Sequence, residues 1–110
     1  MKLTNEISVI LRCKNEENWI GHAIQSIIDN IGLCEIIVVN NNSSDESIRI
    51  VKSFAQDPKL NFEKKNNYTK IKIINIESYS PGKSLNAGIK KATGKYTIIM
   101  SAHCVLKKIN

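Results

Sequence analysis

Four short apolar runs, rich in isoleucine and valine, recur along this chain, and polar residues follow each of them. Runs of this length and composition, bounded by turn-forming residues, are typical of strands buried on both faces. We expect such strands at residues 7–13, 35–39, 71–76 and 96–100. Strands that are apolar on both faces belong to a sheet that other elements cover on both sides.

Between these runs, apolar residues recur at every third or fourth position, which is the period of a helix with one buried face. We expect helices at residues 19–31, 44–56 and 80–92, which end at Gly32, at Asp57-Pro58 and at Thr93-Gly94. The polar segment 59–70 indicates a loop. The order β-α-β-α-β-α-β predicts an α/β fold with a doubly wound, mostly parallel sheet.

The 110 residues suffice for one domain but not for two. No window is long and apolar enough to span a membrane, and the N-terminus lacks the apolar region and cleavage site of a signal peptide. We therefore expect no transmembrane segment and a cytoplasmic location, which is compatible with peripheral attachment to the inner face of the membrane. The three cysteines are odd in number and lack the CxxC spacing, so we expect Cys13 and Cys34 to be small buried residues without a disulfide.

The formal net charge of +6 favours anionic partners such as a phosphate-bearing ligand. Aromatic residues make up only 5% of the chain, and no aromatic RNA-binding motif accompanies the dispersed lysines. A solvated basic face is therefore the preferred interpretation, and no nucleic acid is expected as a partner.

Ligands of doubly wound sheets bind beyond the carboxyl ends of the strands, near the point where the strand order reverses. The segments that follow the four expected strands are residues 12–16, 40–45, 77–83 and 101–104, and they are also the most polar or chemically unusual in the chain. Neither GxGxxG nor GxxxxGK[ST] occurs, which disfavours a dinucleotide site and a P-loop.

Four segments together resemble one family. The segments ISVILRCKNEENWIGHAIQSI, EIIVVNNNSSDES, SPGKSLNAGIKKATGKY and IIMSAHC are similar to the N-terminal, Rossmann-like nucleotide-binding half of a family 2 glycosyltransferase of the GT-A fold. Each motif is weak alone, but the four occur in the family's order and cover residues 7–106. The resemblance implies a site for the nucleotide of a sugar-nucleotide donor.

In that family the loop after the first strand lines the nucleotide pocket. The resemblance therefore implies that Arg12, Lys14, Asn15 and Glu16 bind the donor, with Arg12 or Lys14 at the diphosphate and Glu16 at the base or ribose. An alternative is that Glu16 and Glu17 are acidic residues of a first helical turn, where they favour the helix dipole.

The second strand of family members usually ends in an acidic pair, and here Asn40 and Asn41 take those places. Asparagine can still form hydrogen bonds with a uracil-like edge or a hydroxyl, but it brings no charge. Asp45, farther along the same turn, is expected to cap the next helix.

The third helix resembles the family segment that borders the donor. Lys83 is implied to neutralise phosphate, and Asn86 to fix the loop or contact the donor. Gly88 and Gly94 are expected to serve packing and the end of the helix.

The fourth strand leads into the place of the family's DxD motif, whose last carboxylate binds Mg²⁺ or Mn²⁺. The resemblance places Ser101, Ala102 and His103 there, with His103 at the metal-binding position. A neutral imidazole is an acceptable ligand for Mn²⁺ and a poor one for Mg²⁺. Two alternatives are that His103 contacts the diphosphate without metal, or that it only ends the strand. Cys104 is interpreted as a bystander.

The resemblance implies binding of a nucleotide-diphosphate sugar, with a UDP-sugar preferred, for inverting transfer to a glycan or lipid-linked acceptor. Residues 1–110 are expected to form a single truncated domain, the donor-binding half without the acceptor half, so that catalytic residues, including the general base, stay unassigned. An uncovered edge of the last strand favours a partner chain or self-association. The alternative function is a non-catalytic basic α/β binding module for nucleic acid or a protein partner.

Overall fold

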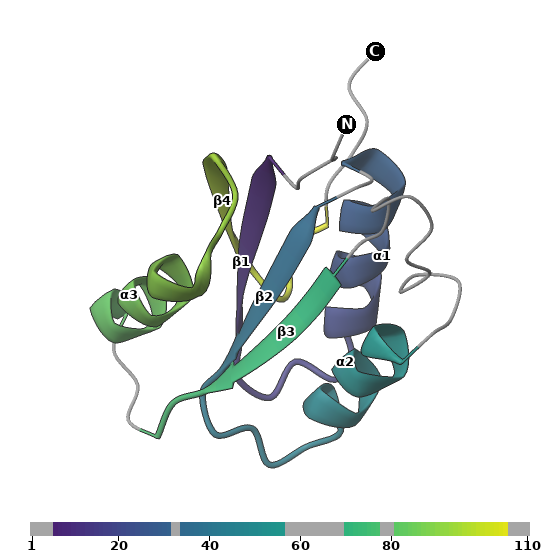
Figure 1. Ribbon diagram of the computed structural model, residues 1–110. Helices are drawn as coiled ribbons and strands as arrows, with labels where there is room; N and C mark the ends of the chain where they lie inside the picture. The colour runs from purple at the N-terminus through teal and green to yellow at the C-terminus, as the bar shows by residue number, and fades with distance from the viewer. Residues whose placement is uncertain (1–5, 32–33, 57–69, 78–80, 106–110) are drawn as a thin grey trace.

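The alternating apolar runs form strands, and the amphipathic segments between them form helices, as Figure 1 shows. The computed structural model describes residues 6–31, 34–56, 70–77 and 81–105. Its elements are β1 (Ile7–Cys13), α1 (Ile20–Asn30), β2 (Glu35–Asn40), α2 (Ser47–Ala55), β3 (Lys70–Asn75), α3 (Pro81–Lys91) and β4 (Tyr96–Ser101). The helix ends predicted at Gly32 and at Asp57-Pro58, and nearly all of the loop predicted at 59–70, lie outside the described residues.

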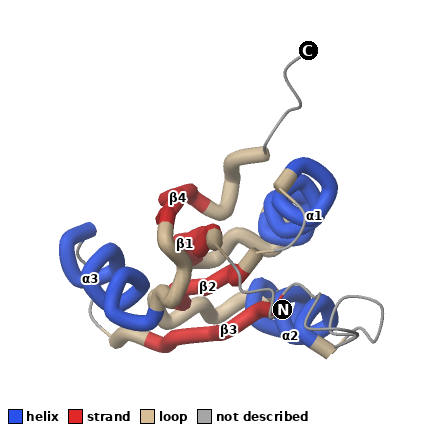
Figure 2. The backbone as a smooth tube through the Cα atoms, turned by 45° about the horizontal axis from the view of Figure 1, so that its top comes forward, coloured by secondary structure: helices blue, strands red, loops and turns tan. Residues whose placement is uncertain are grey.

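The four strands form one parallel sheet in the order β3-β2-β1-β4. Helices α1 and α2 cover one face of this sheet, and α3 lies on the other (Figure 2). The chain runs outward from β1 to β3 and then returns, through α3, to place β4 on the other side of β1. The predicted doubly wound α/β fold is therefore confirmed, and the strand order reverses between β1 and β4.

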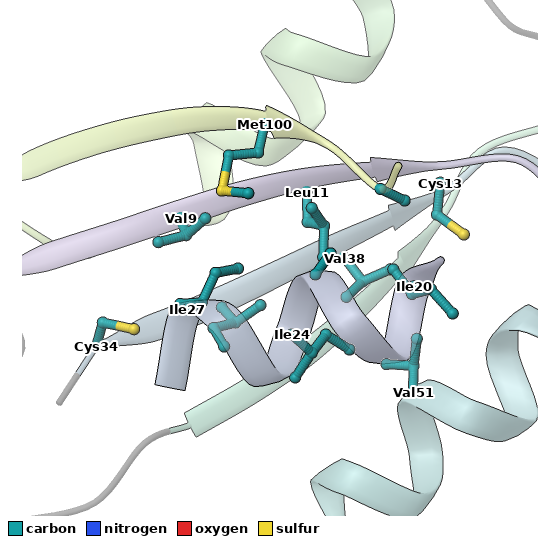
Figure 3. Packing of buried hydrophobic residues seen from close by; sticks show 13 residues of the cluster. Val9, Leu11, Cys13, Ile20, Ile24, Ile27, Cys34, Val38, Val51 and Met100 are labelled. Carbon is teal, nitrogen blue, oxygen red and sulfur yellow. The ribbon is translucent and has the colours of Figure 1, made fainter. Parts of the chain in front are cut away.

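The main core lies between the sheet and α1. Ile20, Ile24 and Ile27, spaced by three and four residues on α1, are fully buried and point toward the strands (Figure 3). Val9 and Leu11, which alternate along β1, meet them from the sheet. Burying each such side chain contributes about 1.5–3 kcal/mol, so this layer provides much of the stability of the fold.

Glycines permit close approach on the opposite face. A Cβ at Gly88 would lie 2.6 Å from the Ile10 side chain, and one at Gly94 would lie 2.7 Å from the backbone nitrogen of Ser8. Ile10 belongs to the smaller core that α3 and its C-terminal end help to cover. The packing role predicted for both glycines is confirmed.

A buried carboxylate ties this face together near the amino ends of the strands. Glu35 accepts hydrogen bonds from Ser8 Oγ (2.6 Å) and from the backbone nitrogen of Thr93 (2.9 Å), and Lys72 Nζ lies 2.6 Å from its Oε1. Burial alone would raise the pKa of Glu35, but the hydrogen bonds from Lys72, Ser8 and Thr93 outweigh it and lower the pKa to about 2. Glu35 thus joins β1, β2, β3 and the connection from α3 to β4.

All three cysteines are free. Cys13 and Cys34 are buried, as predicted, and burial raises the pKa of both thiols, that of Cys34 to about 11. Cys104 is exposed. In the part of the chain that the structure describes, no helix is long and apolar enough to cross a membrane.

Candidate functional site

A cavity of about 250 Å³ opens where β1, β2 and β4 end, at the point where the strand order reverses. Parallel strands direct their carboxyl ends to the same edge, so the loops that follow them meet there. The residues that line the cavity are Arg12, Cys13, Lys14, Glu16, Val39, Asn41, Ser101 and His103.

The loop after β1 is fixed to the loop after β2 through Asn15. Its backbone has a positive φ of 50°, a conformation that asparagine tolerates better than most residues. Asn15 Oδ1 accepts hydrogen bonds from the backbone nitrogens of Ser44 (2.7 Å) and Asp45 (3.2 Å), and its own nitrogen donates to Ser43 Oγ (3.0 Å). Asn15 therefore shapes the site, and it is not among the residues that line the cavity.

Asp45 and Ser47 hold the backbone of the next two residues of that loop. Ser47 Oγ accepts from the nitrogen of Glu16 at 2.7 Å, and Asp45 accepts from the nitrogens of Glu17 (3.1 Å) and Ser47 (2.9 Å). The last of these bonds satisfies the nitrogen of the first residue of α2, but the N-cap position belongs to Glu46, so the capping role predicted for Asp45 is displaced by one residue. Its slight burial raises the pKa of Asp45, but these hydrogen bonds outweigh it and lower the pKa.

The two asparagines that end β2 differ in what they bind. Asn40 donates to Asn75 Oδ1 (2.9 Å) and accepts from the nitrogen of Ser43 (3.1 Å), so its amide serves the structure. Asn41 is only 2% exposed, yet neither its Nδ2 nor its Oδ1 has a hydrogen-bond partner among the described residues. A buried amide without partners costs about 1–3 kcal/mol, so Asn41 is a candidate to form hydrogen bonds with a group that enters the cavity.

Arg12 lies beside Asn41 in the lining of the cavity. Its Nη2 donates to Ser101 Oγ at 3.2 Å across the paired ends of β1 and β4, while its buried Nε has no partner among the described residues. Lys14 adds a second cation to the lining. Two cations and an unpaired guanidinium nitrogen favour an anionic group in the cavity.

The loops after β1 and β4 also meet through a hydrogen bond between side chains. His103 Nδ1 lies 3.1 Å from Glu16 Oε2, with 60% of the histidine side chain and 25% of the glutamate side chain exposed.

The alternative that Glu16 and Glu17 belong to a first helical turn is wrong, because α1 begins only at Ile20 and its first turn has no acidic residue. Ala102 is fully buried in the main core and does not line the cavity.

Lys83 and Asn86 lie elsewhere. They line a separate groove on α3, together with Ile74, Lys90 and Lys91. The structure therefore brings Arg12, Lys14, Glu16, Asn41, Ser101 and His103 together, but does not add these two residues to the set.

The donor set for a metal is small. In the described ranges no three His, Cys, Asp or Glu side chains are grouped closely enough to hold an ion. His103 offers one imidazole nitrogen at the cavity, since Glu16 is hydrogen-bonded to the other, and an imidazole suits Mn²⁺ better than Mg²⁺. The fit is partial, since a bound ion would need further oxygen ligands from a substrate.

Three further residues that position the site were not recognised from the sequence. Ser43 and Ser47 act through hydrogen bonds to the loop after β1, and Val39 forms an apolar part of the cavity wall. Strand alternation places Val39 on the same face as Glu35, and this pattern could have identified it. No local pattern could have identified the serines, because their hydrogen-bond partners lie about 30 residues away in the sequence.

Comparison with known proteins gives relatives that are longer than this chain. An uncharacterised glycosyltransferase, YibD, of Escherichia coli is 29% identical over 93% of the chain, which spans 27% of that protein. A dolichyl N-acetyl-alpha-D-glucosaminyl phosphate 3-beta-D-2,3-diacetamido-2,3-dideoxy-beta-D-glucuronosyltransferase of Methanococcus voltae is 29% identical over 90% of the chain and matches over 29% of its own length. The chain thus spans less than a third of these relatives.

Solved structures share the fold. Residues 1–349 of TarS of Staphylococcus aureus superpose with a TM-score of 0.67 at 25% identity, over 94% of this chain and 28% of that fragment. The mannosyltransferase PcManGT of Pyrobaculum calidifontis, solved in complex with GDP-Man and Mn²⁺, superposes with a TM-score of 0.75 at 20% identity, over 94% of this chain and 29% of that one.

The family model described as glycosyl transferase family 2 matches residues 8–109, nearly the whole chain. Its match agrees with the four motifs, with the doubly wound sheet and with the cavity at the reversal of strand order. This chain belongs to glycosyl transferase family 2.

Proposed function

We propose that the cavity binds the nucleoside diphosphate of a sugar-nucleotide donor, with a UDP-sugar preferred. The observation that carries the proposal is the buried amide of Asn41, which lacks partners among the described residues and lies in the same cavity as Arg12. A uracil edge offers a donor beside an acceptor, which an amide can pair in full. Arg12 and Lys14 then meet the diphosphate.

Divalent metal belongs to the proposal as well. PcManGT was solved with GDP-Man and Mn²⁺, and its fold superposes on this chain. In this protein His103 would hold the ion, and diphosphate oxygens would complete its coordination. Such an ion offsets the negative charge that develops on the leaving nucleotide.

The transfer reaction is proposed for the whole protein of which this fold is the donor-binding part. The sugar of the donor would pass to a hydroxyl of a glycan or lipid-linked acceptor, with inversion at the anomeric carbon. In the donor-binding part, Asn41 binds the base, and Arg12 and Lys14 bind the diphosphate. Ser101 orients Arg12 by accepting a hydrogen bond from its guanidinium.

Calorimetric titration with UDP, GDP and CDP, with and without Mn²⁺, tests the donor site. We expect saturable UDP binding that Mn²⁺ strengthens, and binding about tenfold or more weaker in Asn41→Ala, because one buried hydrogen-bond partner of a ligand is worth about 1–3 kcal/mol. Gln25→Ala, which removes an exposed amide from the outer face of α1, is the control and should bind as the wild type does.

Unchanged UDP affinity in Asn41→Ala would refute the assignment of the base site. Salt-sensitive RNA binding without any preference among nucleotides would instead favour the basic binding module. Membership of glycosyl transferase family 2 counts against that alternative.

A further inference from the structure

The contact between Glu16 and His103 fixes which nitrogen of the imidazole carries a proton. His103 Nδ1 lies 3.1 Å from Glu16 Oε2, within hydrogen-bond distance. An ionised carboxylate can only accept, so the proton must reside on Nδ1. In neutral His103 the lone pair is then on Nε2, for which the structure records no partner among the described residues.

Both side chains are presented from constrained backbone. The nitrogen of Glu16 donates to Ser47 Oγ at 2.7 Å, and its carbonyl accepts from the nitrogens of Trp19 (2.9 Å) and Ile20 (2.8 Å). His103 sits in a tight turn that a hydrogen bond from the nitrogen of Cys104 to the carbonyl of Ser101 closes at 3.0 Å. Hydrogen bonds therefore hold the backbone on both sides of the contact.

Both side chains also line the cavity, whose other walls carry Arg12 and the unpartnered amide of Asn41. A carboxylate that binds one imidazole nitrogen is the common arrangement behind a metal-bound histidine, because it fixes the tautomer and raises the basicity of the other nitrogen. Glu16 is thus hydrogen-bonded to His103. This bond accounts for the position of Glu16 at the cavity without the contact to the base or ribose that the family resemblance implies.

We propose that Glu16 is a positioning residue that holds the Nδ1–H tautomer of His103 and so makes Nε2 the atom that binds a divalent cation at the cavity. The inference deepens the proposed function, on which it rests for the role of the cation. Its test measures the imidazole itself, so that it can fail while nucleotide binding is retained.

The test is long-range ¹H–¹⁵N correlation of the histidine rings at a pH where they are neutral. The chain has two histidines, so a His22→Gln variant assigns the spectrum and His22 provides an internal reference. We expect the Nδ1–H pattern at His103 in the wild type and a shift toward Nε2–H, which unconstrained imidazoles prefer, in Glu16→Gln and Glu16→Ala. Zn²⁺, a diamagnetic probe, should move the Nε2 resonance of His103 and bind about tenfold or more weakly in both variants.

Glu17→Gln is the matched control, because the Glu17 carboxylate accepts from the nitrogen of Glu46 and does not contact His103. It should leave the spectrum of His103 unchanged. An Nε2–H tautomer at His103 in the wild type, or an unchanged tautomer in both Glu16 variants, would overturn the inference. So would Zn²⁺ binding that leaves the Nε2 resonance in place. UDP titration of the same samples reports separately on the donor site, and backbone amide spectra confirm that the variants fold.

Discussion

Replacing Glu35 by glutamine should destabilise the fold strongly at neutral pH. The side chain is 2% exposed, and its hydrogen bonds lower the pKa of its carboxyl from an ordinary 4.5 to about 2. Each pKa unit corresponds to about 1.4 kcal/mol, so the ionised form contributes about 3 kcal/mol to the free energy of unfolding. The Lys72 side chain is 30% exposed, so water can hydrate its ammonium group in the variant. This hydration limits the loss in the free energy of unfolding.

The pH dependence follows from the direction of this shift. Because the pKa of Glu35 is lower in the folded state, the unfolded chain binds the extra proton first as the pH falls. The contribution is complete above about pH 5, declines below the unfolded pKa of 4.5, and is down to roughly 1 kcal/mol at pH 2.5. The difference in stability between the wild type and Glu35→Gln should narrow over the same range.

Urea denaturation at several pH values between 7 and 2.5, followed by circular dichroism, measures this difference. Glu46→Gln is the matched control, since the Glu46 side chain is 59% exposed and pairs with Arg49 on the surface of α2, where an ion pair contributes about 0–1 kcal/mol. A Glu35→Gln protein as stable as the control at pH 7, or a gap that stays constant down to pH 2.5, would refute the reasoning.

Three further predictions concern packing, base binding and thiol reactivity. Gly94→Ala should lower the free energy of unfolding by about 2 kcal/mol or more in denaturant titrations, because its Cβ would strike the backbone of β1; Gly82→Ala, with nothing within 4 Å, should be neutral or slightly stabilising. Asn41→Asp should weaken the binding of UDP and of CDP alike in competition binding, because each base offers one donor beside an acceptor, uracil at N3 and cytosine at its exocyclic amine, and a carboxylate can only accept; unchanged affinity for either nucleotide would contradict this. One thiol, Cys104, should react rapidly with a disulfide reagent in the native protein and all three in denaturant, because Cys13 and Cys34 are buried with raised pKa values.

Local patterns were enough to predict the elements and the edge of the sheet that carries the site. The strand at 7–13 matches β1 at both ends, because its apolar run is bounded by charged residues. The other strands differ slightly: β2 and β4 extend one residue farther, to Asn40 and Ser101, and β3 (Lys70–Asn75) is shifted by one residue at both ends from the expected 71–76. Polar residues at strand ends continue the backbone ladder without an apolar side chain to mark them.

Charged residues inside strands were harder to interpret. Local patterns identify no partner for Lys72, and they show Glu35 only as the first residue of an apolar run. In the structure the two side chains form a partly buried ion pair on the face that α3 covers. Their pairing depends on the register in which Ile37 lies opposite Lys72, and no local pattern encodes the alignment of one strand with another.

The contact between Glu16 and His103 depends on one choice of topology. Both residues follow strands, but 87 positions separate them, and they meet only because β4 pairs with β1. Had β4 paired beyond β3, at a strand spacing of about 4.8 Å, the loop with His103 would lie about 14 Å from the loop with Glu16, too far for a hydrogen bond. The crossover through α3 on the opposite face excludes that arrangement, because it carries the chain back over β2 and β1. A reversal of strand order therefore creates the cavity and also brings a carboxylate to the imidazole at its mouth.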